Sequence, residues 1–136
     1  MALQNIFSGV WRSRYTYPSS SRKDDFTSEQ LVVAYQKGNK LVFESVKGND
    51  SYLAVRLSID HQDDVATGTW QESTSPEGHY KGSVYHGAIQ LIIDEDKHQL
   101  RGKWLGFGKD HEINVGPWEF TYVGDDDTDV RSSRAE

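Results

Sequence analysis

Every tryptophan in this 136-residue chain lies two positions after a glycine. The four frames are Gly9-Val10-Trp11, Gly68-Thr69-Trp70, Gly102-Lys103-Trp104 and Gly116-Pro117-Trp118. Residues two apart in a β-strand point to the same face, so each glycine leaves a gap beside a large indole. Glycine also interrupts strands where a sheet bends or where another group comes close. Four such frames predict a strongly curved sheet closed around an aromatic interior, as in small β-barrels that hold a ligand.

Length and charge limit the class of protein. The length predicts one domain with a sizeable core. The chain has no cysteine, which excludes disulfides and Cys-ligated metals. Residues 1–7 lack the basic start and long apolar stretch of a signal peptide, and no apolar run is long enough to cross a membrane, so we expect a cytoplasmic protein with no membrane partner. The net charge of −6 disfavours direct binding to nucleic acid.

Alternating residues and recurrent turn signals predict an antiparallel meander of eight strands. The expected strands cover residues 9–17, 30–36, 40–46, 52–59, 65–73, 79–93, 99–107 and 116–123. A ninth strand would arise if Gly82 and Gly87 split the long run or if residues 109–115 formed an edge strand. Residues 27–31 are the one candidate for a short helix, although the valines that follow favour a strand.

Three segments follow from this pattern. Residues 1–8 are expected to form an N-terminal arm, and residues 9–123 a single β-barrel domain. Residues 124–136 contain five acidic residues against two arginines and bury little apolar surface. They predict a disordered acidic tail.

Gly9-Val10-Trp11 in the first strand, followed by antiparallel strands up to a closing aromatic strand, resembles the calycin superfamily, which contains lipocalins, fatty-acid-binding proteins and avidins. That resemblance implies that Trp11 plugs one end of the barrel beside an arginine from a late strand, for which Arg101 is the candidate. Residues 67–72, 85–91 and 102–108 also resemble small barrel modules fused behind helix-turn-helix domains in actinobacterial regulators, within a likeness that spans residues 9–123.

The likeness to regulator modules implies ligand sensing and not catalysis. Eight residues before the first strand are too few for a DNA-binding helix pair. We therefore expect sensing to be relayed to a separate regulatory protein.

The candidate ligand-binding residues are aromatic side chains on the indole faces and three polar side chains. The aromatic set is Trp11, Tyr15, Tyr17, Trp70, Trp104 and Trp118, and the polar set is Glu72, Tyr80 and His86. Glu72 shares a face with Trp70 and is expected inside the mouth, because a few polar groups in an apolar pocket fix a ligand's orientation. The alternatives are an outward Glu72, or one satisfied by tyrosine and arginine, and tyrosines that serve only for packing.

The alternatives of an enzyme and of a haem protein are supported by fewer residues than ligand binding. No histidine lies in a metal-binding motif, and neither a nucleophile elbow nor a phosphate loop is present. Glu72 and His86 would form the acid–base pair if the barrel were a cyclase or isomerase. A single histidine can ligate haem, and Gly9-Val10-Trp11-Arg12 with Tyr17-Pro18 faintly resembles haem-binding barrels of the nitrobindin type. A lone histidine on a strand is more often structural.

We therefore expect an all-β protein: an antiparallel up-and-down β-barrel of about eight strands, calycin- and lipocalin-like. Its expected function is to bind a small, mostly apolar molecule, as a sensor or carrier, without a cofactor. The alternatives are a cyclase or isomerase, a haem-binding barrel, and an interaction module whose core is filled by its own side chains. The ligand and the oligomeric state stay open.

Overall fold

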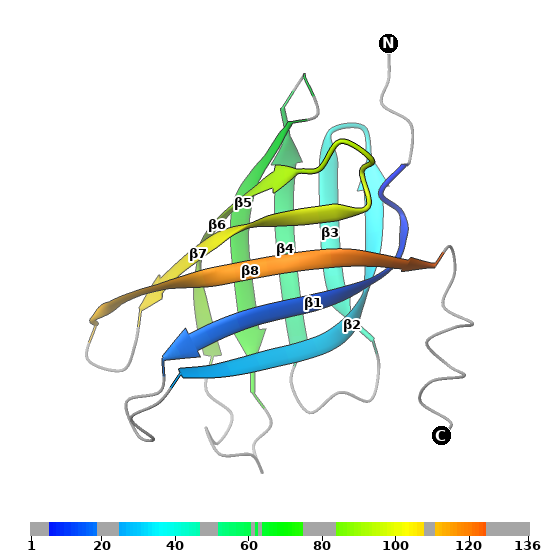
Figure 1. Ribbon diagram of the computed structural model, residues 1–136. Coiled ribbons are helices and arrows are strands. Elements are labelled where there is room, and N and C mark those ends of the chain that lie inside the picture. Colours follow the sequence, from blue (N-terminus) through cyan, green and yellow to red (C-terminus); the bar gives the residue numbers. More distant parts are fainter. Residues whose placement is uncertain are drawn as a thin grey trace, which may run out of the picture.

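A computed structural model of the protein describes residues 6–18, 25–46, 52–60, 62, 64–74, 84–107 and 111–124. The strands are β1 (Gly9–Pro18), β2 (Asp25–Lys37), β3 (Lys40–Ser45), β4 (Tyr52–Ile59), β5 (Val65–Ser73), β6 (Val84–Ile93), β7 (Gln99–Phe107) and β8 (Ile113–Gly124). Each pairs antiparallel with the next, and β8 pairs with β1, which closes the barrel (Figure 1). The predicted all-β, eight-stranded up-and-down barrel is confirmed.

The strands decide three points that the sequence left open. Residues 27–31 lie within β2, where pairing with β1 holds them extended. Gly87 does not split β6, and residues 113–115 extend the last strand instead of forming an edge strand. Residues 79–83, with Gly82, and residues 125–136 of the expected tail lie outside the described residues.

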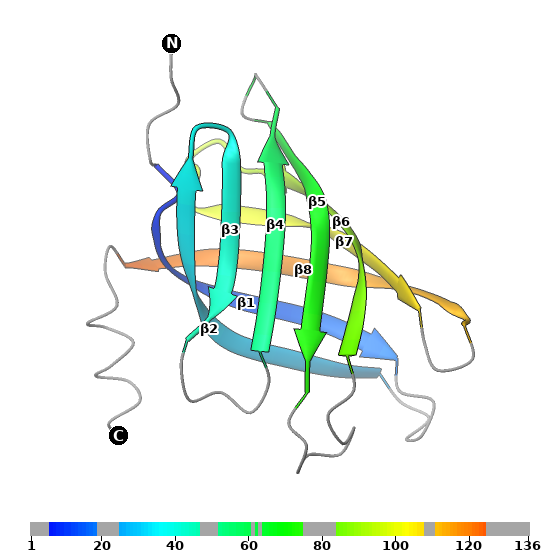
Figure 2. The ribbon, with the colours of Figure 1, turned by 180° about the vertical axis from the view of Figure 1, so that it is seen from behind.

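Side chains alternate between the interior and the outer surface along each strand. On β1, Trp11 and Ser13 are buried, whereas Arg12 and Arg14 are exposed. Figure 2 shows β3, β4 and β5 on one side of the barrel, with β8 and β1 running across them on the other. The aromatic faces of these two sides therefore meet in the interior.

One end of the barrel is packed solid, and we call it the closed end. It carries the β2–β3, β4–β5 and β6–β7 connections. Phe43 stacks on Phe120 with ring centroids 4.1 Å apart, and Trp11 meets Phe43 edge-on at 5.6 Å. Phe7, from the expected N-terminal arm, is also fully buried there, and its amide donates to the side-chain oxygen of Gln36 at 3.1 Å. We call the opposite end, where β1 finishes and β2 begins, the open end, because its interior aromatic residues Tyr15, Tyr17, Phe26 and Tyr85 are only partly buried.

Glycines let neighbouring strands approach more closely than any side chain would permit. A Cβ on Gly68 would meet the carbonyl oxygen of Arg56 on β4, and one on Gly102 would meet that of Gln90 on β6. The predicted sharp curvature is therefore present at these frames.

The space beside each glycine is not filled by the tryptophan of the same Gly-x-Trp frame. Trp70 lies opposite Gly87 and over Gly106, and Trp104 lies opposite Gly116. Each of these indoles thus crosses a glycine on the neighbouring strand, because only a residue without a side chain leaves that space.

Candidate functional site

A hydrogen bond between side chains crosses the interior of the barrel. The Tyr15 hydroxyl, on β1, donates to a carboxylate oxygen of Glu72, on β5, at 2.6 Å. In the closed order of eight strands, β1 and β5 are four strands apart in either direction, so the bond joins opposite walls. The two residues are 57 positions apart in the chain. Barrel closure alone brings them together.

The surroundings of Tyr15 keep its hydroxyl in the neutral, donating form. Burial raises the pKa of Tyr15 well above its ordinary range, and the negative charge of Glu72 and the hydrogen bond to it raise the pKa further. A hydrogen bond with Ser28 acts in the opposite direction and is the smaller effect. The ring packs against Trp118 at 4.5 Å and against Tyr17 at 5.7 Å. Tyr15 therefore acts as a donor held in a fixed position.

We expect stability to fall above about pH 10, the ordinary pKa of tyrosine, and to fall more steeply in the native protein than in Tyr15→Phe. Folding raises the pKa of Tyr15, so the unfolded chain releases this proton at a lower pH than the folded chain. The contribution is complete below about pH 10 and is lost as the pH rises towards the folded pKa. Urea unfolding at pH 9 and pH 11 measures the loss of unfolding free energy between these two pH values. This loss should be about 1 kcal/mol larger in the native protein than in Tyr15→Phe. Equal losses in both proteins would contradict the buried phenol.

Each of the four indole N–H groups donates within the protein. Trp70 donates to the Leu105 carbonyl at 3.1 Å, Trp104 to the Thr16 carbonyl at 3.0 Å, and Trp118 to the Ser13 hydroxyl at 2.9 Å. Trp11 donates to the Phe7 carbonyl at 2.8 Å. These rings are therefore fixed parts of the wall, and they offer a ligand an apolar surface in place of a free donor.

The structure brings some of the predicted site residues together and separates others. Tyr15, Tyr17 and Glu72 are partly buried on the interior side of their strands, and Trp118 adjoins them. Trp70 meets Trp104 at 5.6 Å and Trp118 at 5.9 Å, so all three indoles belong to the same aromatic group. Contact of these side chains with a ligand stays a prediction.

Trp11 lies at one end of the barrel, as the resemblance implies, whereas Arg101 does not lie beside it. Trp11 is fully buried at the closed end, where it packs on Phe43 and Tyr122. Arg101 is exposed, because the inward positions of β7 are Leu100, Gly102 and Trp104. The arginine partner implied by the resemblance is therefore not Arg101.

His86 lies on the outer face and not in the lumen. The register pairs Glu72 with Tyr85 and Gln71 with His86, and successive residues face opposite sides. Glu72 and His86 are thus on opposite faces of the sheet, and the acid–base pair of the enzyme alternative is not assembled. Tyr80 lies outside the described residues.

Sequence reasoning missed two partners of the site. Tyr85 is partly buried and packs against the core, and Ser28 bonds to Tyr15. The parity of β6 identifies Tyr85, because Ile89 and Leu91 share its face and are buried. No local pattern identifies Ser28, since its role depends on pairing between β2 and β1.

Comparisons with known proteins identify no relative of this chain. No protein-family model matches the chain, and no curated protein sequence is significantly similar to it. The closed eight-stranded barrel is compatible with a calycin-like fold. Among the described residues, no three histidine, aspartate or glutamate side chains are grouped to hold a metal ion, and no helix is long and apolar enough to span a membrane.

Proposed function

We propose that the protein binds a small, mostly apolar molecule in the open end of the barrel, against the Tyr15–Glu72 pair. The bond that crosses the lumen at 2.6 Å carries this proposal. A carboxylate among aromatic rings is costly to bury, whereas apolar residues would fill the same space at no such cost. Convergent polar groups in an apolar pocket are typical of sites that orient a ligand.

The exposure of the interior residues favours the open end. Leu41, Leu91, Leu100 and Phe120, towards the closed end, are completely buried, and burial extends to Leu53, which lies opposite Glu72 in the register. Tyr15, Tyr17, Phe26, Glu72 and Tyr85 are only partly buried. A core filled by its own side chains, as the interaction-module alternative requires, is therefore found towards the closed end. The partly exposed aromatic residues at the open end support ligand binding there.

The chemistry of the pair indicates the polar part of the ligand. Glu72 is an acceptor, and the Tyr15 hydroxyl already donates to it. A ligand with one N–H or O–H group would extend this network through the carboxylate, while its apolar body packs on Trp70, Trp104 and Trp118. Tyr80 stays a predicted polar contact.

The wider setting is part of the same proposal. We infer a calycin-like sensor or carrier that acts in the cytoplasm and passes its signal to a separate regulatory protein. Reversible binding without turnover is expected, because His86 and Glu72 project from opposite faces of the sheet and this acid–base pair is not assembled. The filled closed end and the curved, aromatic open end support a ligand held at one mouth.

A neutral fluorescent amine tests the proposal. N-phenyl-1-naphthylamine should bind and quench tryptophan emission, and Glu72→Gln should weaken its binding about tenfold, or ~1.4 kcal/mol, because the amine loses a charged acceptor. Tyr15→Phe should also weaken binding, since the carboxylate then loses the donor that positions it. Fluorescence titration measures the affinities.

The matched control is Glu44→Gln, which makes the same change on the outer side of β3 and should leave binding unchanged. Urea unfolding checks that each variant is folded. No binding to the native protein, or equal affinity in all variants, would refute the open-end site.

A further inference from the structure

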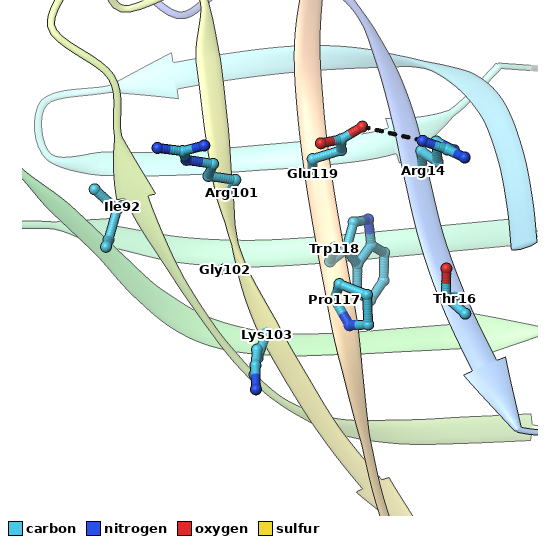
Figure 3. Close-up of a pocket in the computed structure, with 9 residues that line it drawn as sticks. All are labelled: Arg14, Thr16, Ile92, Arg101, Gly102, Lys103, Pro117, Trp118 and Glu119. Atoms are coloured by element: carbon cyan, nitrogen blue, oxygen red, sulfur yellow. Dashed lines mark ion pairs between the residues drawn. The ribbon is translucent and has the colours of Figure 1, made fainter.

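A hollow lies on the outside of the barrel, over β6, β7, β8 and β1. Its volume is about 410 Å³. It is lined by Arg14, Thr16, Ile92, Arg101, Gly102, Lys103, Pro117, Trp118 and Glu119 (Figure 3). We call it the outer groove. The Trp118 indole is only 2% exposed and packs on Tyr15 and Trp70 inside the barrel, so its ring belongs to the lumen side of the wall.

The charge of the outer groove is opposite to that of the chain. Arg14, Arg101 and Lys103 face one acidic side chain, Glu119, whereas the whole chain carries a net charge of −6. The register places Glu119 between Arg14 and Arg101 on the neighbouring strands. A carboxylate oxygen of Glu119 forms an ion pair with the Arg14 guanidinium at 3.6 Å. A second ion pair joins Arg14 to Glu29 at 3.9 Å. Arg14 is therefore already compensated.

Arg101 and Lys103 are the two cations of the groove outside the Arg14–Glu119 ion pair. Arg101 and Lys103 are two apart on β7, so both project from its outer face, and both are exposed. Within the described ranges, neither forms an ion pair. A guanidinium, with its planar fork of donors, and an ammonium are each suited to a phosphate or carboxylate group.

Apolar groups stand next to these cations. Ile92 is 62% exposed and lies directly opposite Arg101 in the register, and Pro117 lies opposite Lys103. We propose that the outer groove binds a small aromatic anion, a phosphate or carboxylate held by Arg101 and Lys103, with its ring against Ile92 and Pro117. This site does not depend on the lumen proposal.

Phenyl phosphate is the probe, and amide chemical shifts of isotope-labelled protein locate it. Saturable shifts should appear at the amides of Arg14, Thr16, Arg101, Gly102, Lys103 and Glu119. Replacing both cations, by Arg101→Gln with Lys103→Gln, should weaken binding at least about tenfold, since two charge-assisted contacts are lost. Inorganic phosphate should bind several-fold more weakly than phenyl phosphate, and Ile92→Ser should remove that difference. The affinity for phenylacetate, compared with that for phenyl phosphate, shows whether the groove prefers a carboxylate or a phosphate group.

The matched control removes two positive charges from the opposite side of the barrel, by Lys40→Gln with Arg56→Gln. Both residues are exposed, on β3 and β4. Their loss should not change the affinity. Equal weakening in both double variants would show a general charge effect, and shifts that never saturate or that fall on the lumen residues would overturn the outer site. All five substitutions are at exposed side chains, and thermal melting of each variant checks its fold.

Discussion

Trp118→Ala is expected to lower the free energy of unfolding by about 3–5 kcal/mol, the range for truncating a buried aromatic residue. The indole is 2% exposed and packs against Tyr15, Trp70 and Phe120 at centroid distances of 4.5 to 5.9 Å. Its loss leaves a cavity that three rigid rings cannot close. It also removes the donor to the hydroxyl of Ser13, which is 1% exposed.

Urea unfolding followed by circular dichroism measures this loss. Trp118→Phe should cost less, because it keeps a ring and loses mainly the hydrogen bond and part of the volume. Leu105→Ala, at an outward position of β7 that is 38% exposed, is the control and should cost about 1 kcal/mol or less. A loss below about 1 kcal/mol for Trp118→Ala would mean that the indole is not part of the core.

Gly87→Ala is expected to destabilise the barrel by about 3 kcal/mol, at the upper end for an added methyl group in a packed interior. The new Cβ would meet the carbonyl oxygen of Leu105 on β7 and would lie 2.8 Å from the indole nitrogen of Trp70. One obstacle is backbone and the other is a ring held by a hydrogen bond to that same carbonyl at 3.1 Å. Neither can move without breaking the other contact.

Denaturant unfolding and tryptophan emission test this change together. Besides the lower stability, the emission should shift, because Trp70 must leave its position. Gly38→Ala is the control: its φ of +60° makes a side chain strained by about 1–2 kcal/mol, yet the added Cβ meets nothing within 4 Å. If Gly87→Ala cost no more than Gly38→Ala, the close approach of β6 and β7 would be wrong.

Local sequence patterns determined most of the architecture. Strands and turns follow from period-two alternation and from turn residues, which act over a few positions. The Gly-x-Trp frames correctly indicated strong curvature and an aromatic interior, because glycine and tryptophan have few alternative uses in a strand. Glu72 could be placed on the indole face by counting from Trp70, since no irregularity interrupts β5.

The assembly of the site was decided by tertiary structure. His86 was expected in the lumen, yet it lies on the outer face of β6, and Tyr85, Ile89 and Leu91 occupy the inward face. The pairing of β6 with β5 and β7 fixes this parity, because a shift of one residue reverses every side chain. The Tyr15–Glu72 bond joins strands that are neighbours in neither sequence nor sheet. Such a contact depends on the closure of the whole barrel, which no local pattern encodes.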